Sequence, residues 1–99
     1  MMYNIYYGSI GDRLKVAYHY TKDFRNEKEA LEEAKKGASS LYYKFEGKFG
    51  LPSFTQISNE AKLTGIPMKK LFEDHIYDMM RWYAIPTEED SISSKDIVW

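Results

Sequence analysis

The sequence contains, at residues 2–21, the stretch MYNIYYGSIGDRLKVAYHYT, in which two alternating runs flank a glycine-containing turn. Side chains of a strand point alternately to its two faces, so Tyr3, Ile5 and Tyr7 share one face of the first run. Turn chemistry follows in the GSIGD segment of residues 8–12. This pattern predicts an N-terminal β-hairpin.

The second strand of the hairpin is expected over residues 13–21. Alternation turns four of its side chains inward, those of Leu14, Val16, Tyr18 and Tyr20. The side chains of Lys15, Ala17 and His19 then point outward. A lone hairpin is marginally stable in water, so this one must pack on helices or pair with a further strand. Residues 97–99 are either that short added strand or a tail.

Three helices are expected after the hairpin. The first spans residues 27–46, with Asn26 as its N-cap and Glu29 in the third position of a capping box. Gly37 costs about 1 kcal/mol against alanine inside a helix, which indicates close packing at that position. The helix has one apolar stripe, formed by Ala30, Leu31, Ala34, Ala38, Leu41, Tyr42, Phe45 and Phe49.

The second helix is short and runs from its cap, Ser53, to about Leu63. The third begins at Pro67, which suits a first turn, and extends to Ala84. Its stripe consists of Phe72, Ile76, Met79 and Tyr83, flanked by Met68 and Met80. The expected fold class is therefore α+β, with the hairpin packed on about three helices in one domain, and with residues 87–99 as a partly ordered tail or added strand.

Composition excludes several classes of function. The 99 residues carry 14 Lys+Arg against 15 Asp+Glu, without the basic excess of a duplex-DNA binder. The absence of cysteine excludes disulfides, thiolate catalysis and cysteine-based zinc sites. No apolar run approaches the ~20 residues needed to span a bilayer, and no signal peptide is evident. We therefore expect a cytoplasmic protein with no membrane partner.

His75 and Asp78 form the best acid–base pair by spacing, because residues three apart share one helix face. They support an alternative in which the chain is a hydrolase. No recognised catalytic motif accompanies them, and metal binding would need further ligands. We expect instead a surface charge cluster in which Asp78 faces Arg81, and we predict a protein that is not an enzyme and has no metal or cofactor.

A more informative segment is YYKFEGKFGLP at residues 42–52. On a helical wheel Tyr43 points away from the apolar stripe, near Lys36 and Ser40, while Lys44 and Lys48 lie on one flank, one turn apart. An exposed tyrosine can stack on a base while ammonium groups meet phosphates. The alternative is that another element or a second subunit covers the tyrosine.

A second cluster is Arg81-Trp82-Tyr83. Tyr83 belongs to the core stripe of the third helix, Trp82 lies on its flank, and Arg81 faces outward. Tryptophan and arginine are common hot-spot residues of interfaces. Trp82 is alternatively a residue at the edge of the core.

The tyrosine-rich hairpin, the helix end YYKFEGKFGLP and the final DMMRWYAIP together resemble a class of small phage-encoded proteins. The similarity covers Tyr3 to Pro86. The resemblance implies a protein that acts on the host by inhibiting an enzyme or blunting a defence system. Some phage proteins of similar size sequester cyclic or ADP-ribose-derived nucleotide signals as oligomeric sponges, although no motif of theirs matches here.

Two functions follow from these expectations. The first is a non-enzymatic counter-defence protein of the host bacterial cytosol, which sequesters a nucleotide-derived immune signal between subunits. Its ligand-binding residues would be Tyr43, Lys44, Lys48, Arg81 and Trp82. The second is a protein–protein inhibitor of a host enzyme or defence factor, with the same residues as an exposed aromatic patch and the acidic run 88–90 steering towards a basic partner. A homo-oligomer is expected in both cases.

Overall fold

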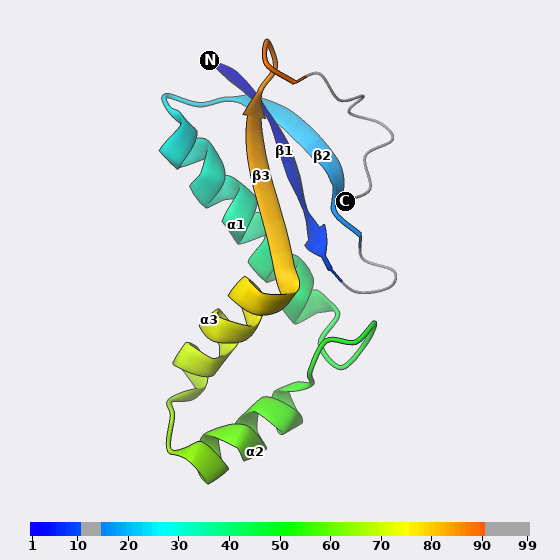
Figure 1. Ribbon diagram of the computed structural model, residues 1–99, viewed down its shortest axis with the longest axis vertical. Coiled ribbons are helices and arrows are strands. Elements are labelled where there is room, and N and C mark those ends of the chain that lie inside the picture. Colours follow the sequence, from blue (N-terminus) through cyan, green and yellow to red (C-terminus); the bar gives the residue numbers. More distant parts are fainter. Residues whose placement is uncertain (11–14, 91–99) are drawn as a thin grey trace.

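A computed structural model describes residues 1–10 and 15–90 of the chain (Figure 1). Three strands form one antiparallel sheet in the order β2-β1-β3, and three helices accompany it, so the fold is α+β as predicted. Residues 97–99 lie outside the described part. The elements in chain order are β1 (Met2–Ser9), β2 (Ala17–Asp23), α1 (Glu27–Lys44), α2 (Phe54–Thr64), α3 (Met68–Met79) and β3 (Met80–Pro86).

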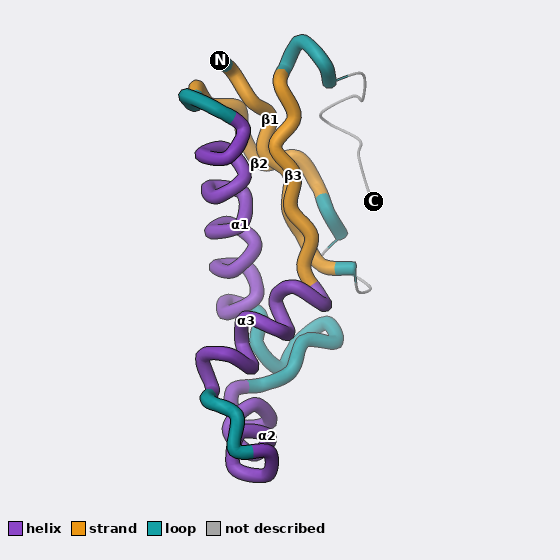
Figure 2. Tube along the Cα trace, turned by 60° about the vertical axis from the view of Figure 1, so that its left-hand side comes forward, coloured by secondary structure: helices purple, strands orange, loops and turns teal. Residues whose placement is uncertain are grey.

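One face of β1, the central strand, packs on α1. Tyr3 and Ile5 are buried there against Ala30 and Ala34 of the helix. Tyr7 is partly buried against the same cluster, so the three side chains share one face as the alternation predicts. Figure 2 shows α1 running along this side of the sheet. The main core therefore lies between α1 and the strands β1 and β3.

A β-bulge corrects the expected orientation of β2. The register shifts between Ile5, which pairs with Tyr20, and Tyr6, which pairs with Tyr18. His19 is therefore an extra residue in β2, and the alternation breaks there. Tyr20 packs on the side of α1, whereas Tyr18 packs against Tyr6 on the opposite face. The prediction that both tyrosines turn to one face is wrong, because alternation holds only along a continuous ladder.

Helix α1 begins at its predicted N-cap and packs on its predicted stripe, but the Glu29 side chain accepts from Arg25 Nε over 3.2 Å instead of completing the expected capping box. The Asn26 side chain accepts a hydrogen bond of 2.9 Å from the Glu29 backbone N–H. The helix ends at Lys44, two residues before the predicted end. Its buried face consists of Ala30, Ala34, Ala38 and Tyr42, all with no exposed surface.

Gly37 of α1 touches an aromatic ring, which confirms the expected close packing. A Cβ at this position would lie 2.3 Å from Cε2 of Tyr7. The ring of Tyr7 is also held by other contacts, because it packs against the core under α1 and stacks on His19 with centroids 3.6 Å apart. Glycine is thus required by the approach of the sheet to the helix.

Helices α2 and α3 form an arm that extends beyond one end of the sheet (Figures 1 and 2). Ser53 caps α2 as predicted, in a capping box with Gln56. Gly65 ends the helix with a φ of 72°, a left-handed conformation that glycine adopts without strain. Ile57 of α2 and Leu71 and Ile76 of α3 are buried. None of the helices within the described ranges is long and apolar enough to cross a membrane.

The predicted third helix is too long, because α3 ends at Met79 and the next seven residues form β3. The segment is rich in aromatic residues, which favour strands. Pairing with β1 satisfies backbone groups of the central strand that a two-stranded hairpin would leave open. Tyr83, expected on the helix stripe, packs instead with Tyr6 on the sheet face opposite α1.

A polar network lies on that opposite face of the sheet. The Asn4 amide donates a 2.7 Å hydrogen bond to the Asp90 carboxylate, and the Tyr6 hydroxyl donates to the same oxygen. The Thr21 hydroxyl donates to the Asn4 side-chain oxygen over 2.6 Å. Through these bonds, Asp90 anchors the segment that follows β3 onto β1. Burial and the carboxylate raise the pKa of the fully buried Tyr6.

Candidate functional site

The outer surface of α1 carries a hollow of about 580 Å³ around Tyr43. Tyr43 lies near Lys36 and Ser40, where the helical wheel places it, and it is 42% exposed. All the lining residues belong to α1, so none of the other described elements closes the hollow on its far side. The lining residues are Glu32, Lys35, Lys36, Ser39, Ser40 and Tyr43.

One side of the Tyr43 ring rests on aromatic rings of its own subunit. Its centroid lies 5.4 Å from that of Phe72 in α3 and 6.0 Å from that of Phe54 in α2. We call these three residues the aromatic patch. Phe54 is 43% exposed, and Phe72 is partly buried. The arm therefore supports Tyr43 from one side while the other side stays open to solvent.

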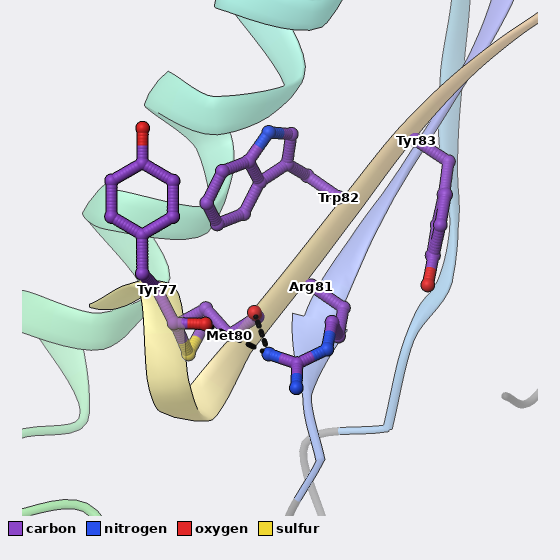
Figure 3. A pocket seen from close by; sticks show the side chains of 5 residues that line it. All are labelled: Tyr77, Met80, Arg81, Trp82 and Tyr83. Carbon is purple, nitrogen blue, oxygen red and sulfur yellow. Dashed lines mark hydrogen bonds between the residues drawn. The ribbon is translucent and has the colours of Figure 1, made fainter. Parts of the chain in front are cut away.

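A second hollow, of about 590 Å³, lies between α1 and β3. Its wall includes Tyr77 and Trp82, with ring centroids 5.4 Å apart (Figure 3). Lys35 Nζ lies 4.7 Å from the Tyr77 ring centroid and donates to its hydroxyl over 3.1 Å. We call this hollow the α1–β3 groove. Its lining residues are Glu27, Lys28, Leu31, Glu32, Lys35, Tyr77 and Trp82.

The two hollows share Glu32 and Lys35. The tertiary fold thus brings Tyr43 and Trp82, two of the predicted site residues, to neighbouring hollows along one helix. Lys35 and Tyr77 were not among the site residues predicted from the sequence. Lys35 could have been found from its spacing of eight residues before Tyr43, which places both on one helical face.

Trp82 lies at the edge of the core and also lines two hollows. It is partly buried against the two core clusters under α1, as a core-edge residue is. Its ring also forms part of the wall of the α1–β3 groove and of a smaller hollow of about 230 Å³ beside β3. Figure 3 shows the ring beside Tyr77, on the opposite side of β3 from Arg81.

The Arg81 side chain binds backbone carbonyls at the C-terminal end of α3. Its Nη1 donates to three backbone carbonyls, those of Met80 at 2.7 Å, Tyr77 at 2.9 Å and Asp78 at 3.1 Å. Figure 3 draws Arg81 with Met80 and Tyr77. A cation at a helix C-terminus also interacts favourably with the helix dipole. The contact expected between Asp78 and Arg81 therefore runs through the aspartate carbonyl. The arginine closes the helix where the chain turns into β3.

Replacement of Arg81 by alanine is expected to lower the free energy of unfolding by about 1 kcal/mol, because carbonyls at the end of α3 lose a charged donor. For a chain of this length the melting temperature should fall by roughly 4–8 °C. Circular dichroism melting would measure the change. Lys48→Ala, at an exposed position in the turn after α1, is the control and should stay within about 0.5 kcal/mol of the unaltered chain. Equal stability of Arg81→Ala and the unaltered chain would contradict the capping role.

Lys44 and Lys48 lie away from both hollows. Lys44 Nζ is 5.4 Å from the centroid of the Phe45 ring, and Lys48 follows in the turn after α1. Both are exposed, and neither lines the hollow around Tyr43 or the α1–β3 groove. The fold supplies Lys35 and Lys36 beside Tyr43 in their place.

His75 contacts a carboxylate on the neighbouring helix. Its Nε2 lies 3.2 Å from the Glu60 carboxylate, so the pair connects α3 to α2. The carboxylate that His75 contacts is therefore that of Glu60 and not that of Asp78. Over residues 1–10 and 15–90, no group of three or more histidine, aspartate or glutamate side chains is placed to hold a metal ion.

Comparison of the chain with protein-family models, with curated proteins and with solved structures finds no match. The resemblance to small phage-encoded proteins stays a prediction that rests on the sequence segments alone.

Proposed function

We propose that this chain is a non-enzymatic phage protein that counters host defence in the bacterial cytoplasm by sequestering a small, nucleotide-derived immune signal. The observation that supports the proposal is the hollow in which Tyr43 lies beside Lys35, Lys36, Ser39 and Ser40. The tyrosine offers an exposed ring face for a base. The lysines and serines offer donors for phosphate oxygens.

The charges around Tyr43 favour a compact anion. Lys35 and Lys36 face one acidic residue, Glu32, in the lining of the hollow. Lys36 Nζ, on an exposed side chain, also lies 3.8 Å from the partly exposed Glu33 carboxylate, a surface pair that a phosphate can displace at little cost. A small surplus of positive charge suits one or two phosphates better than a long polyanion.

The open side of the hollow favours a homo-oligomer. A ligand held by one helix face leaves much of its surface in water, whereas small-molecule sites usually bury most of their ligand. A second subunit over Tyr43 would enclose the ligand and cover the exposed aromatic patch. The proposed site therefore lies between subunits.

Replacement of Tyr43 by alanine is expected to weaken nucleotide binding by about 10- to 100-fold, because stacking on an aromatic ring contributes about 1–3 kcal/mol per base. Tyr43→Phe keeps the ring and should bind within a few-fold of the unaltered chain. Isothermal titration against a panel of cyclic dinucleotides and cyclic ADP-ribose isomers is the measurement.

Two lysine variants form a matched pair for the same titration. Lys36→Ala should weaken binding, because Lys36 lines the hollow, whereas Lys44→Ala should not, because Lys44 lies outside it. Absence of heat with every ligand, at a concentration where the chain is a folded oligomer, would sink the proposal. An equal loss in both lysine variants would move the site away from this hollow.

The second candidate function is inhibition of a host enzyme or defence factor through protein–protein contact. It is favoured by the apolar side chains exposed on the arm and beside it: Leu63 at 88%, Phe54 at 43%, Tyr43 at 42% and Met68 at 38%. Exposed apolar groups that gather on one part of a protein are typical of interaction surfaces.

A pull-down from host lysate separates the two candidates. An inhibitor should recover a stoichiometric host protein, and Leu63→Ser, at the most exposed apolar side chain of the arm, should weaken that recovery without weakening nucleotide binding. A sequestering protein should recover no such partner.

A further inference from the structure

The outer edge of β3 differs from that of β2. Both are edge strands of the described sheet. β2 carries the bulge at His19, a feature that natural proteins use to disturb an edge, whereas β3 pairs with β1 without a register shift from Met80 to Pro86. A regular edge can accept another strand.

The register fixes which backbone groups of β3 point outward. Thr87 N–H donates to the Met2 carbonyl over 3.0 Å, and Ile10 N–H donates to the Met79 carbonyl over 2.9 Å. Hydrogen-bonded pairs alternate along an antiparallel ladder, so residues 81, 83 and 85 bond to β1. The backbone groups of Trp82 and Ala84 consequently face the outer edge, together with those of Met80 and Pro86.

The chain's own groups occupy both ends of this edge. Met80 N–H donates to the Ile76 carbonyl, and the Met80 carbonyl accepts from Arg81. Pro86 has no N–H, and its carbonyl accepts from Glu89 N–H over 2.9 Å. Among the described residues, this leaves a short window in the middle of the edge, formed by the N–H and C=O groups of Trp82 and Ala84.

This window lies beside the α1–β3 groove. Figures 1 and 2 show α1 on one face of the sheet, and its first turns, with Glu27, Lys28 and Leu31, line the α1–β3 groove together with Trp82. The window is short, because it comprises only the outward groups of Trp82 and Ala84, and this length suits one short extended segment. Strand addition between a sheet edge and a helix is an established mode of peptide recognition.

We propose that the outer edge of β3 binds an extended segment of a partner protein as a fourth strand of the sheet. Its backbone pairs with Trp82 and Ala84, and one of its side chains enters the α1–β3 groove. The groove presents Leu31, Tyr77 and Trp82, so that side chain is apolar. Its charged wall carries two acidic and two basic residues, Glu27, Glu32, Lys28 and Lys35, so the segment has a low net charge.

This surface is separate from the hollow around Tyr43, and the inference holds whether or not nucleotides bind there. The two hollows do share Glu32 and Lys35, so a strand in the groove would lie next to any ligand beside Tyr43.

Amide hydrogen exchange followed by NMR tests the proposal with a capped synthetic peptide of alternating valine and threonine. In the free protein, the amides of Trp82 and Ala84 should exchange faster than those of Arg81, Tyr83 and Ile85, which bond to β1. At saturating peptide, exchange at Trp82 and Ala84 should slow by at least about tenfold. The same peptide with N-methyl groups at alternate residues is the control and should leave both amides unchanged.

Ala84→Pro removes one outward N–H and leaves the bonds of β3 to β1 in place, since proline is tolerated on an edge strand whose N–H faces outward. It should weaken peptide binding by about tenfold. If this variant fails to fold, the comparison of the plain and methylated peptides on the unaltered chain decides alone. Equal effects of the two peptides, or Trp82 and Ala84 amides already protected in the free protein, would overturn the proposal.

Discussion

The free energy of unfolding is expected to be about 3 kcal/mol lower at a pH one unit above the ordinary tyrosine pKa of 10.0 than at neutral pH. The cause is a pair of fully buried tyrosines, Tyr6 and Tyr42. Desolvation raises the pKa of Tyr6, and the Asp90 carboxylate raises it further. Desolvation, with smaller contributions from Tyr43 and Glu60, raises the pKa of Tyr42 to about 12.

The sign of the effect follows from where the protons are held. Above pH 10 the unfolded chain releases tyrosine protons that the folded chain still keeps. Their contribution is fully present below the unfolded pKa and is lost as pH rises towards the folded values. Each tyrosine accounts for about 1.4 kcal/mol at the first pH unit above 10. Burial also raises the pKa of Tyr7 and of Tyr20, which act in the same direction.

Urea unfolding at a series of pH values from neutral to alkaline measures this loss. Tyr42→Phe is the matched variant, because it removes one of the two buried phenols and should roughly halve the loss. Within the described residues the Tyr42 hydroxyl has no hydrogen-bond partner, so its removal should leave stability at neutral pH unchanged or higher. A free energy of unfolding that stays constant up to pH 11 would show that these rings do not hold their protons in the fold.

Gly37→Ala is expected to lower the free energy of unfolding by about 2 kcal/mol and the melting temperature by roughly 10 °C. An added methyl group would lie 2.3 Å from the Tyr7 ring, which stacks on His19 on its other side. Overpacking costs about 1–3 kcal/mol, and three ring atoms at 2.3–2.8 Å place this contact at the upper end of that range. The better helix propensity of alanine returns about 1 kcal/mol, which leaves a net loss of about 2 kcal/mol. Calorimetry of the variant is the measurement.

The Tyr7→Leu background controls for the cause of this loss. With the ring gone, Gly37→Ala should become neutral or stabilising by up to about 1 kcal/mol, since only the helix propensity remains. A loss of the same size in both backgrounds would mean that the contact between Gly37 and Tyr7 is not responsible.

Local signals in the sequence were sufficient for much of the fold. Asn26 and Ser53 cap their helices as predicted, because a cap depends only on residues within one turn. The contact at Gly37 also followed from a local conflict between glycine and helix propensity.

The error at the end of α3 arose because the spacing of Phe72, Ile76, Met79 and Tyr83 fits a helix. Whether residues 80–86 continue a helix or form a strand depends on the open edge of β1, far away in the chain. The bulge at His19 likewise depends on the partner strand, so alternation within β2 alone could not reveal it.

The candidate site was predictable only in part for the same reason. Tyr43 was found because a helical wheel shows which side of α1 lacks apolar residues. Tyr77 and Trp82 meet α1 only through the turn from α3 into β3. Arginine is a residue type common at interface hot spots, which is why Arg81 was predicted as a site residue. Its place at the end of α3 instead directs its side chain to backbone carbonyls.

The central position of β1 has a consequence during synthesis. The strand made first must wait for its second neighbour, because its pairing with β3 joins residues roughly 70–80 positions apart. At about 5–20 residues per second, the nascent chain carries β1 with one side unpaired for roughly 4–16 s. Helix α1 is made in the interval and can shield one face of the strand, but not its edge. The sheet is completed only when residue 86 has left the ribosomal exit tunnel.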